Sequence, residues 1–169
     1  MTAKFIARFD DPIIEPLQNQ LNLRQRILVV EDEQDLRQLT AEVLIDAGYQ
    51  VDVAEDGVAA WSKLQLSQYE LLITDQFMPK VSGVELLKKI HAAHMTLPVI
   101  MATGFLPTWG FALHTWLQPV KMLLKPYSFQ KLLAIVKNVL DATDSAADGH
   151  ALSNLLPESP LPTQPRLTA

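Results

Sequence analysis

Four charged residues follow apolar stretches that are typical of buried β-strands. Glu31 and Asp32 come directly after Ile27–Val30, Asp75 follows a second apolar run, and Lys125 follows a third. Open α/β sheets carry their chemistry at the carboxyl ends of the strands, so the sequence predicts that these groups meet at one sheet edge. A carboxylate in that place can serve as a nucleophile or as a metal ligand.

Short apolar runs alternate with segments of helical period between residues 27 and 140. This alternation predicts an α/β fold, a parallel sheet with helices on both faces. The strands are predicted at Ile27–Val30, Val51–Ala54, Leu71–Thr74, Val99–Ala102 and Met122–Leu124.

Five helices should follow these five strands. In the first, Leu36, Leu39, Val43 and Leu44 form one apolar stripe, and Gly48 supplies a left-handed C-terminal cap. The others are expected at about Val58–Leu66, Val84–His94 and Thr108–Leu117, and from the N-cap Ser128 to about Leu140. The aromatic residues of the fourth helix, Trp109 and Trp116, are interpreted as core, with a partner-docking patch as the alternative.

At 169 residues the chain is long enough for one domain with tails. We expect an N-terminal arm over 1–25, the domain over 26–140, and a disordered tail over 141–169, where prolines stand among many Ser, Thr and Ala residues.

The composition excludes several functional classes. The net charge is −5 with acids and bases scattered along the chain, so nucleic acid is not an expected partner. There are no cysteines, which excludes a disulfide framework and thiol chemistry. No apolar run approaches the ~20 residues that span a bilayer, and no signal peptide is evident, so a soluble cytoplasmic protein is expected.

Four motifs in this order give the chain a family resemblance. It resembles the receiver domain of bacterial two-component response regulators, over Arg26 to about Leu140 and as a stand-alone single domain. That resemblance implies a doubly wound, flavodoxin-like sheet of five parallel strands in the order 2-1-3-4-5. The motifs are Val30-Glu31-Asp32-Glu33, Asp75-x-x-Met78-Pro79-x-x-x-Gly83, Ala102-Thr103-Gly104 and Lys125-Pro126.

The resemblance also implies roles for these residues. Asp75 would accept a phosphoryl group from a histidine kinase or a phosphotransfer protein, Lys125 would pair with the phosphoryl oxygens, and Thr103 would sense the added charge. The Lys125-Pro126 peptide bond is expected to be cis. Phosphoryl transfer requires positive charge around the peripheral oxygens more than covalent assistance, which fits this set of residues.

A divalent cation is the expected cofactor. Glu31, Asp32 and Asp75 would form three clustered carboxylates that repel one another unless a cation binds, and such hard oxygen ligands suit Mg²⁺ or Mn²⁺. The backbone carbonyl of Phe77 is a further ligand by resemblance.

Other functions fit the sequence less well. A haloacid-dehalogenase-type phosphatase needs a second acid two residues after its aspartate, where this chain has Phe77. The six glycines form no nucleotide-binding loop. His91 and His94 lack a third metal ligand nearby in the sequence and are assigned no role.

The sequence therefore predicts a phosphorylation-dependent signalling switch in a phosphorelay rather than an enzyme. Phosphorylation would alter a surface that binds a downstream protein, in a monomer or weak dimer. The alternative is a receiver-like interaction module that is not phosphorylated. Met122 stands where receivers commonly carry a Tyr or Phe whose ring moves on activation, so a weaker response of the surrounding surface is expected.

Overall fold

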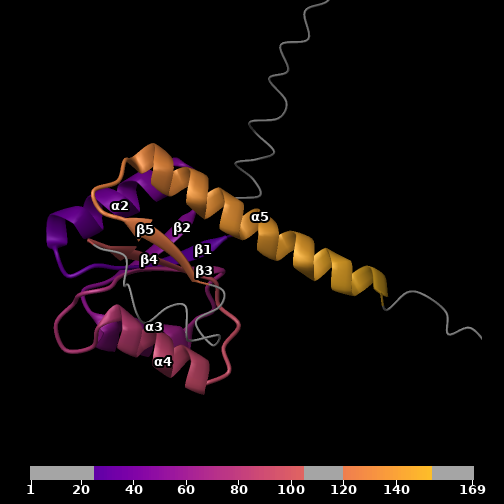
Figure 1. Cartoon of the computed structure of the whole chain (residues 1–169), viewed down its shortest axis with the longest axis horizontal. Helices are drawn as coiled ribbons and strands as arrows, with labels where there is room; N and C mark the ends of the chain where they lie inside the picture. The colour runs from indigo at the N-terminus through magenta and orange to yellow at the C-terminus, as the bar shows by residue number, and fades with distance from the viewer. Residues whose placement is uncertain (1–24, 105–119, 154–169) are drawn as a thin grey trace, which may run out of the picture.

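The computed structural model describes residues 25–104 and 120–153, and its centre is one parallel β-sheet. Its strands lie in the order β2-β1-β3-β4-β5, which confirms the predicted order (Figure 1). Each apolar run of the sequence forms one strand, within two residues of the predicted bounds. The strands are β1 Arg26–Val30, β2 Gln50–Ala54, β3 Leu71–Asp75, β4 Val99–Thr103 and β5 Val120–Leu124.

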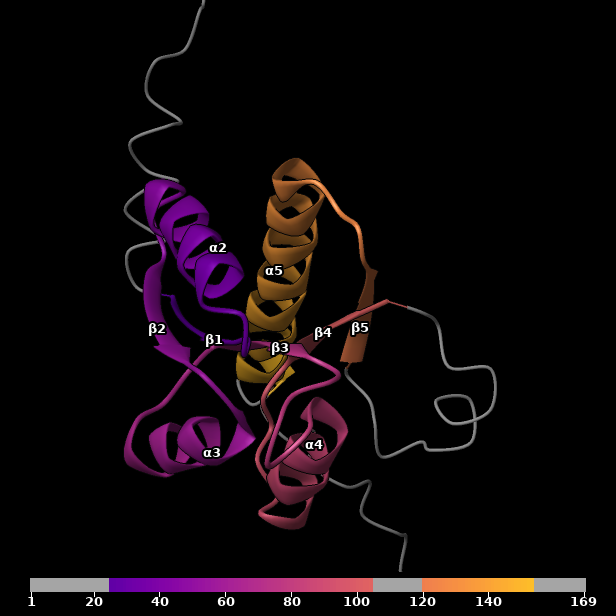
Figure 2. The same ribbon diagram turned by 90° about the vertical axis from the view of Figure 1, so that its left-hand side faces the viewer.

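Helices cover both faces of this sheet, as the predicted α/β class requires. The helices α2, Gln34–Asp46, and α5, Phe129–Ser153, lie on one face. The helices α3, Gly57–Leu66, and α4, Gly83–Ala92, lie on the other, and Figure 2 shows the two layers from the side. The predicted helix 108–117 lies outside the described residues, as does the N-terminal arm up to residue 24.

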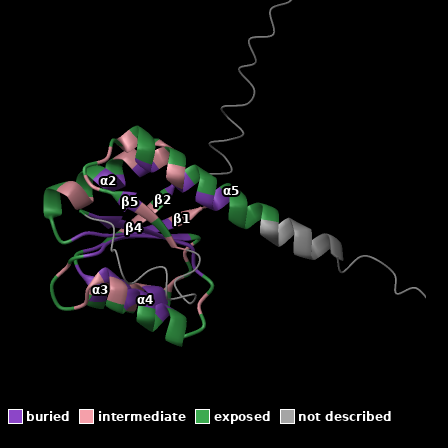
Figure 3. Cartoon of the chain, viewed as in Figure 1, coloured by how far each residue is buried: buried purple, intermediate pink, exposed green. Residues whose placement is uncertain are grey.

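The core is divided by the sheet into two apolar layers. Along β1, Leu28 and Val30 pack toward α3 and α4, whereas Ile27 and Val29 pack toward α2 and α5. Successive side chains of a strand point to opposite faces, so a strand covered on both faces must be apolar throughout. Figure 3 shows the buried positions gathered on the sheet and on the inner sides of the helices.

Helix α2 differs from the predicted stripe at one position. Leu39 is 45% exposed, and the buried face of the helix is formed by Thr40, Ala41 and Leu44. Those three positions face the sheet, which leaves Leu39 at the edge of the contact. The expected cap is present, because Gly48 has φ 94° and the next amide donates to the carbonyl of Leu44 at 3.1 Å.

Helix α5 begins as predicted but ends later. The hydroxyl oxygen of Ser128 accepts a bond from the amide of Lys131 at 3.3 Å. The helix then continues to Ser153, so a disordered tail starting at residue 141 is wrong for 141–153. This stretch is rich in alanine, the strongest helix former, and contains no proline before Pro157. Within the described residues, no helix has the length and apolar character to cross a bilayer.

Candidate functional site

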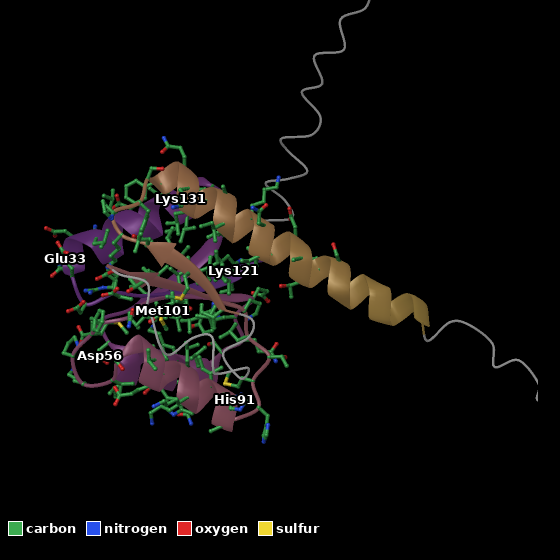
Figure 4. All side chains as sticks on the ribbon, in the orientation of Figure 1. Glu33, Asp56, His91, Met101, Lys121 and Lys131 are labelled. Carbon is green, nitrogen blue, oxygen red and sulfur yellow. The ribbon has the colours of Figure 1, made fainter. Side chains whose placement is uncertain are left out.

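The sheet brings the predicted site residues to one edge. Glu31 follows β1, Asp75 and Thr103 end β3 and β4, and Lys125 follows β5. These strands are consecutive in the sheet, and all of them are parallel, so their carboxyl ends lie side by side. Figure 4 shows Glu33 and Asp56 at this end of the molecule and His91 at the opposite end. His91 and His94 are both exposed there, away from the acidic residues.

Three carboxylates form the centre of the site. One oxygen each from Glu31, Asp32 and Asp75 can be chosen so that all lie within 4.8 Å of one another. Glu31 and Asp75 are buried and Asp32 is exposed, so the cluster is open to solvent on one side. Hard oxygen ligands in a cluster with water access fit Mg²⁺ or Mn²⁺.

Lys125 is the cation that faces this cluster. Its ammonium lies 3.0 Å from Oε2 of Glu31 and 3.1 Å from Oδ1 of Asp75. Burial raises the pKa of Glu31 above its usual value, and the opposing effect of Lys125 does not cancel this rise. Burial lowers the pKa of Lys125, but its bonds to the two acids outweigh burial, and its net pKa is raised. The lysine therefore remains charged at neutral pH.

The backbone after β1 is held by a residue that the sequence did not single out. Nη1 of Arg37, one turn into α2, donates to the carbonyl oxygen of Glu31 at 2.7 Å and to that of Asp32 at 3.2 Å. The guanidinium thus fixes the loop that carries both acids. An arginine on a solvated helix gives no sequence signal for this role.

Thr103 is fully buried and its hydroxyl has a specific acceptor. It donates to Oε1 of Gln76, the residue that follows Asp75. Gln76 was not predicted as a site residue, because a glutamine after a strand is ordinarily an exposed loop residue. The register of β3 against β4 places its side chain opposite Thr103.

The start of α4 lies against the end of β3. A Cβ atom on Gly83 would stand 2.2 Å from the carbonyl oxygen of Asp75, which only a glycine permits. The amide of Gly83 donates to the carbonyl of Gln76 at 3.1 Å. The glycine that ends the Asp75 motif is therefore required by close packing beneath Asp75.

A second loop supports the segment after β3. The buried carboxylate of Asp56 caps α3 through the amides of Val58 and Ala59 and also binds the ammonium of Lys80. Lys80 has φ 64°, and the next residue, Val81, accepts a bond from the amide of Gly57 at 3.2 Å. These contacts fasten the β2–α3 loop to the β3–α4 loop, and no local sequence pattern predicts them.

Two further expectations concern the chain around the site. The Lys125-Pro126 peptide bond is cis, as the resemblance implied. The Phe77 side chain is 54% exposed, and the role of its carbonyl as a metal ligand stays a prediction. Beside Lys125 lies a hollow of about 410 Å³ that is lined by Leu36, Lys125, Pro126, Tyr127 and Phe129.

Comparison with known proteins agrees with this arrangement. The family model described as the response regulator receiver domain matches residues 27–137, about two thirds of the chain. The chain belongs to this family. It is 30% identical over 118 residues to the response regulator receiver protein CpdR of Brucella abortus, a match that covers 70% of this chain and 98% of CpdR.

Longer relatives match over part of their length. The alkaline phosphatase synthesis transcriptional regulatory protein PhoP of Bacillus subtilis is 29% identical over 132 residues, which are 78% of this chain and 55% of PhoP. The chain spans about half the length of the transcriptional regulators that it matches.

Among solved structures, the response regulator TrrA of Thermotoga maritima, in complex with Mg²⁺ and BeF, is 33% identical to this receiver. The match has a TM-score of 0.60 and covers 68% of this chain and 98% of TrrA.

Proposed function

We propose that this receiver is a phosphorylation switch in which Asp75 accepts a phosphoryl group from a histidine kinase or a phosphotransfer protein. The observation that carries the proposal is the Lys125 ammonium, held between the carboxylates of Glu31 and Asp75 at the open edge of the sheet. A phosphoryl group arriving at Asp75 would meet a cation already in place.

The transfer itself needs little from the protein beyond position and charge. A carboxylate oxygen of Asp75 forms a bond to phosphorus while the bond between phosphorus and the imidazole nitrogen of the donor breaks. The electron pair of that bond stays on the imidazole, which leaves. Lys125 moves from carboxylates to phosphoryl oxygens as negative charge accumulates there, and this stabilises the transition state.

Glu31, Asp32, Asp75 and the carbonyl of Phe77 would hold the divalent cation, Mg²⁺ or Mn²⁺. The bound cation would supply positive charge opposite the phosphoryl oxygens. The compact carboxylate cluster supports this assignment, and TrrA, a relative of 33% identity, was solved with Mg²⁺ and BeF. Arg37 would keep the Glu31–Asp32 loop in the geometry that the cation requires.

The output of the switch would be a changed protein-binding surface. Phosphorylation adds about −1.5 to −2 charges at pH 7, and Thr103 would report that charge to the loop after β4. The half-exposed Leu39 and the hollow beside Leu36 and Lys125 give α2 an apolar face for a donor protein. Several relatives are transcriptional regulators about twice as long as the match, and our proposal of a protein target concerns the receiver alone.

An interaction module without phosphorylation is the alternative. Such a module would have no need for three carboxylates within 4.8 Å and a lysine shared between two of them. Like charges at this distance are unfavourable without a cation, so their presence favours the switch.

Intact mass after incubation with acetyl phosphate tests the proposal. We expect one phosphoryl mass that disappears on chelation of Mg²⁺ and in Asp75→Asn. Asp46→Asn, which changes an exposed carboxylate at the end of α2, is the matched control and should be labelled like wild type. Labelling that survives Asp75→Asn would refute the assignment.

A further inference from the structure

Gln76 is held rigidly beside the acceptor. Its amide donates to the carbonyl of Ala102 at 2.9 Å, and its own carbonyl accepts from Gly83 at 3.1 Å. The residue is only 9% exposed. Backbone hydrogen bonds to β4 and to α4 therefore fix the main chain of Gln76 and the direction in which its side chain leaves it.

The side chain of Gln76 accepts a hydrogen bond from the hydroxyl of Thr103. A threonine hydroxyl has one proton to donate, and here Oε1 of Gln76 accepts it in a fully buried setting. Asp75 and Ala102 are register partners, so Gln76 and Thr103 are the next pair along the same two strands. The register of the two strands therefore brings the Gln76 and Thr103 side chains together.

A phosphoryl group on Asp75 would bring three strongly accepting oxygens to this edge. Charged acceptors form stronger bonds than a neutral amide oxygen. The phosphoryl oxygens and Oε1 of Gln76 would then compete for one proton, and the outcome would decide which way the Thr103 hydroxyl points.

We propose that Gln76 is a positioning residue that holds the Thr103 hydroxyl in its unphosphorylated orientation and so sets how readily the switch turns on. This inference rests on the proposed phosphorylation of Asp75. The amide oxygen lowers the free energy of the unphosphorylated state, because it accepts a buried hydrogen bond from the hydroxyl in that orientation. Phosphorylation has to break that bond before Thr103 can bind the phosphoryl group.

Two substitutions separate this role from simple packing. Gln76→Met keeps the length of the side chain and removes the strong acceptor, so binding of beryllofluoride at saturating Mg²⁺ should tighten about two- to tenfold. Gln76→Glu keeps an acceptor and adds negative charge next to Asp75, so binding should weaken. Gln65→Met, at an exposed position of α3, is the matched control and should leave the affinity unchanged.

A double-mutant cycle with Thr103→Val provides the decisive readout. In the Thr103→Val background, Gln76→Met should no longer change beryllofluoride affinity, because no hydroxyl remains to be released. In the absence of beryllofluoride, three-bond couplings should show different Thr103 rotamer populations in wild type and in Gln76→Met.

The outcomes distinguish this inference from the function on which it rests. If wild type takes neither beryllofluoride nor a phosphoryl group, the proposed function fails and the inference fails with it. If wild type responds but Gln76→Met binds beryllofluoride equally or more weakly, the inference alone is overturned. Weaker binding would mean that the Gln76 amide donates to the phosphoryl group. If Gln76→Met does not fold, Gln76→Glu decides, and unchanged affinity there would also overturn the proposal.

Discussion

The ammonium of Lys125 lies 3.0 Å from a carboxylate oxygen of Glu31, although 94 positions separate the two residues in the sequence. The same ammonium lies 3.1 Å from Asp75. One cation thus partly neutralises two of the three acids. A phosphoryl group would attract the lysine away from these carboxylates. A divalent cation would compete with the lysine for the same carboxylate oxygens.

Replacing Lys125 should therefore affect the two ligands in opposite directions. In Lys125→Met, affinity for Mg²⁺ should rise by roughly tenfold, because the acids lose the positive charge that competes with the metal. Affinity for beryllofluoride should fall about 10- to 100-fold, because a charge-assisted bond to the anion is lost. Isothermal titration of each ligand measures both effects, with the exposed Lys88→Met as control. A parallel fall in both affinities would contradict this account of the lysine.

The Asp56–Lys80 pair should make the free energy of unfolding depend on pH in the acid range. The bond from Lys80 and the amides of α3 hold the pKa of Asp56 below its usual 3.8. A lowered pKa in the folded state contributes stability that is present above the unfolded value and is lost as pH falls through the folded value.

Urea unfolding from pH 7 to pH 2 measures this contribution. The difference in unfolding free energy between wild type and Asp56→Asn should be constant above about pH 5 and should shrink below pH 4. Asparagine keeps the helix cap but not the charge. Asp56→Ala removes the cap as well and should cost about 0.5–2 kcal/mol at neutral pH. An advantage that stays unchanged down to pH 2 would show that the ion pair contributes nothing.

Adding one methyl group beneath Asp75 should damage the site. In Gly83→Ala, the new Cβ would meet the Asp75 carbonyl at 2.2 Å, and backbone atoms cannot turn aside as a flexible side chain can. We expect a loss of about 1–3 kcal/mol in unfolding free energy and weaker binding of Mg²⁺. Gly104→Ala is the matched control, since a Cβ there would have no neighbour within 4 Å among the residues that the structure describes. Equal tolerance of both changes would refute the close-packing argument.

The strands and the acidic edge could be predicted from the sequence because both depend on local signals. An apolar run such as Ile27–Val30 indicates a buried parallel strand, and the polar residue after it must lie at the end of the sheet. Once the strands are parallel and adjacent, Glu31, Asp75 and Lys125 have to converge. The family motifs added the order of the strands.

The contacts between loops could not be predicted in the same way. Gln76 faces Thr103 only through the register of β3 against β4, and Asp56 binds Lys80 from another loop. The exposure of Leu39 depends on the rotation of α2 over the sheet, which helical periodicity alone leaves open. Such features follow from tertiary packing, and no local pattern of residue types encodes them.

Met122 offers the last test, because it stands where receivers commonly carry a Tyr or Phe whose ring moves on activation. Its side chain is half-buried against the cluster that contains Met101, its register partner on β4. A flexible thioether fits inward or outward at little rotamer cost and has no hydroxyl to fix either state. In wild type, beryllofluoride should therefore shift the amide resonances of β5 only modestly.

Met122→Tyr should enlarge those amide shifts across β5, because a bulky phenol cannot occupy both sites equally well. Two-dimensional amide spectra with and without beryllofluoride, at constant Mg²⁺, measure the difference. Met122→Ala serves as the control, and its shifts should be as small as those of wild type. If wild type instead gives large cooperative shifts that Met122→Ala abolishes, the methionine is itself the moving residue, and the expectation of weak coupling is wrong.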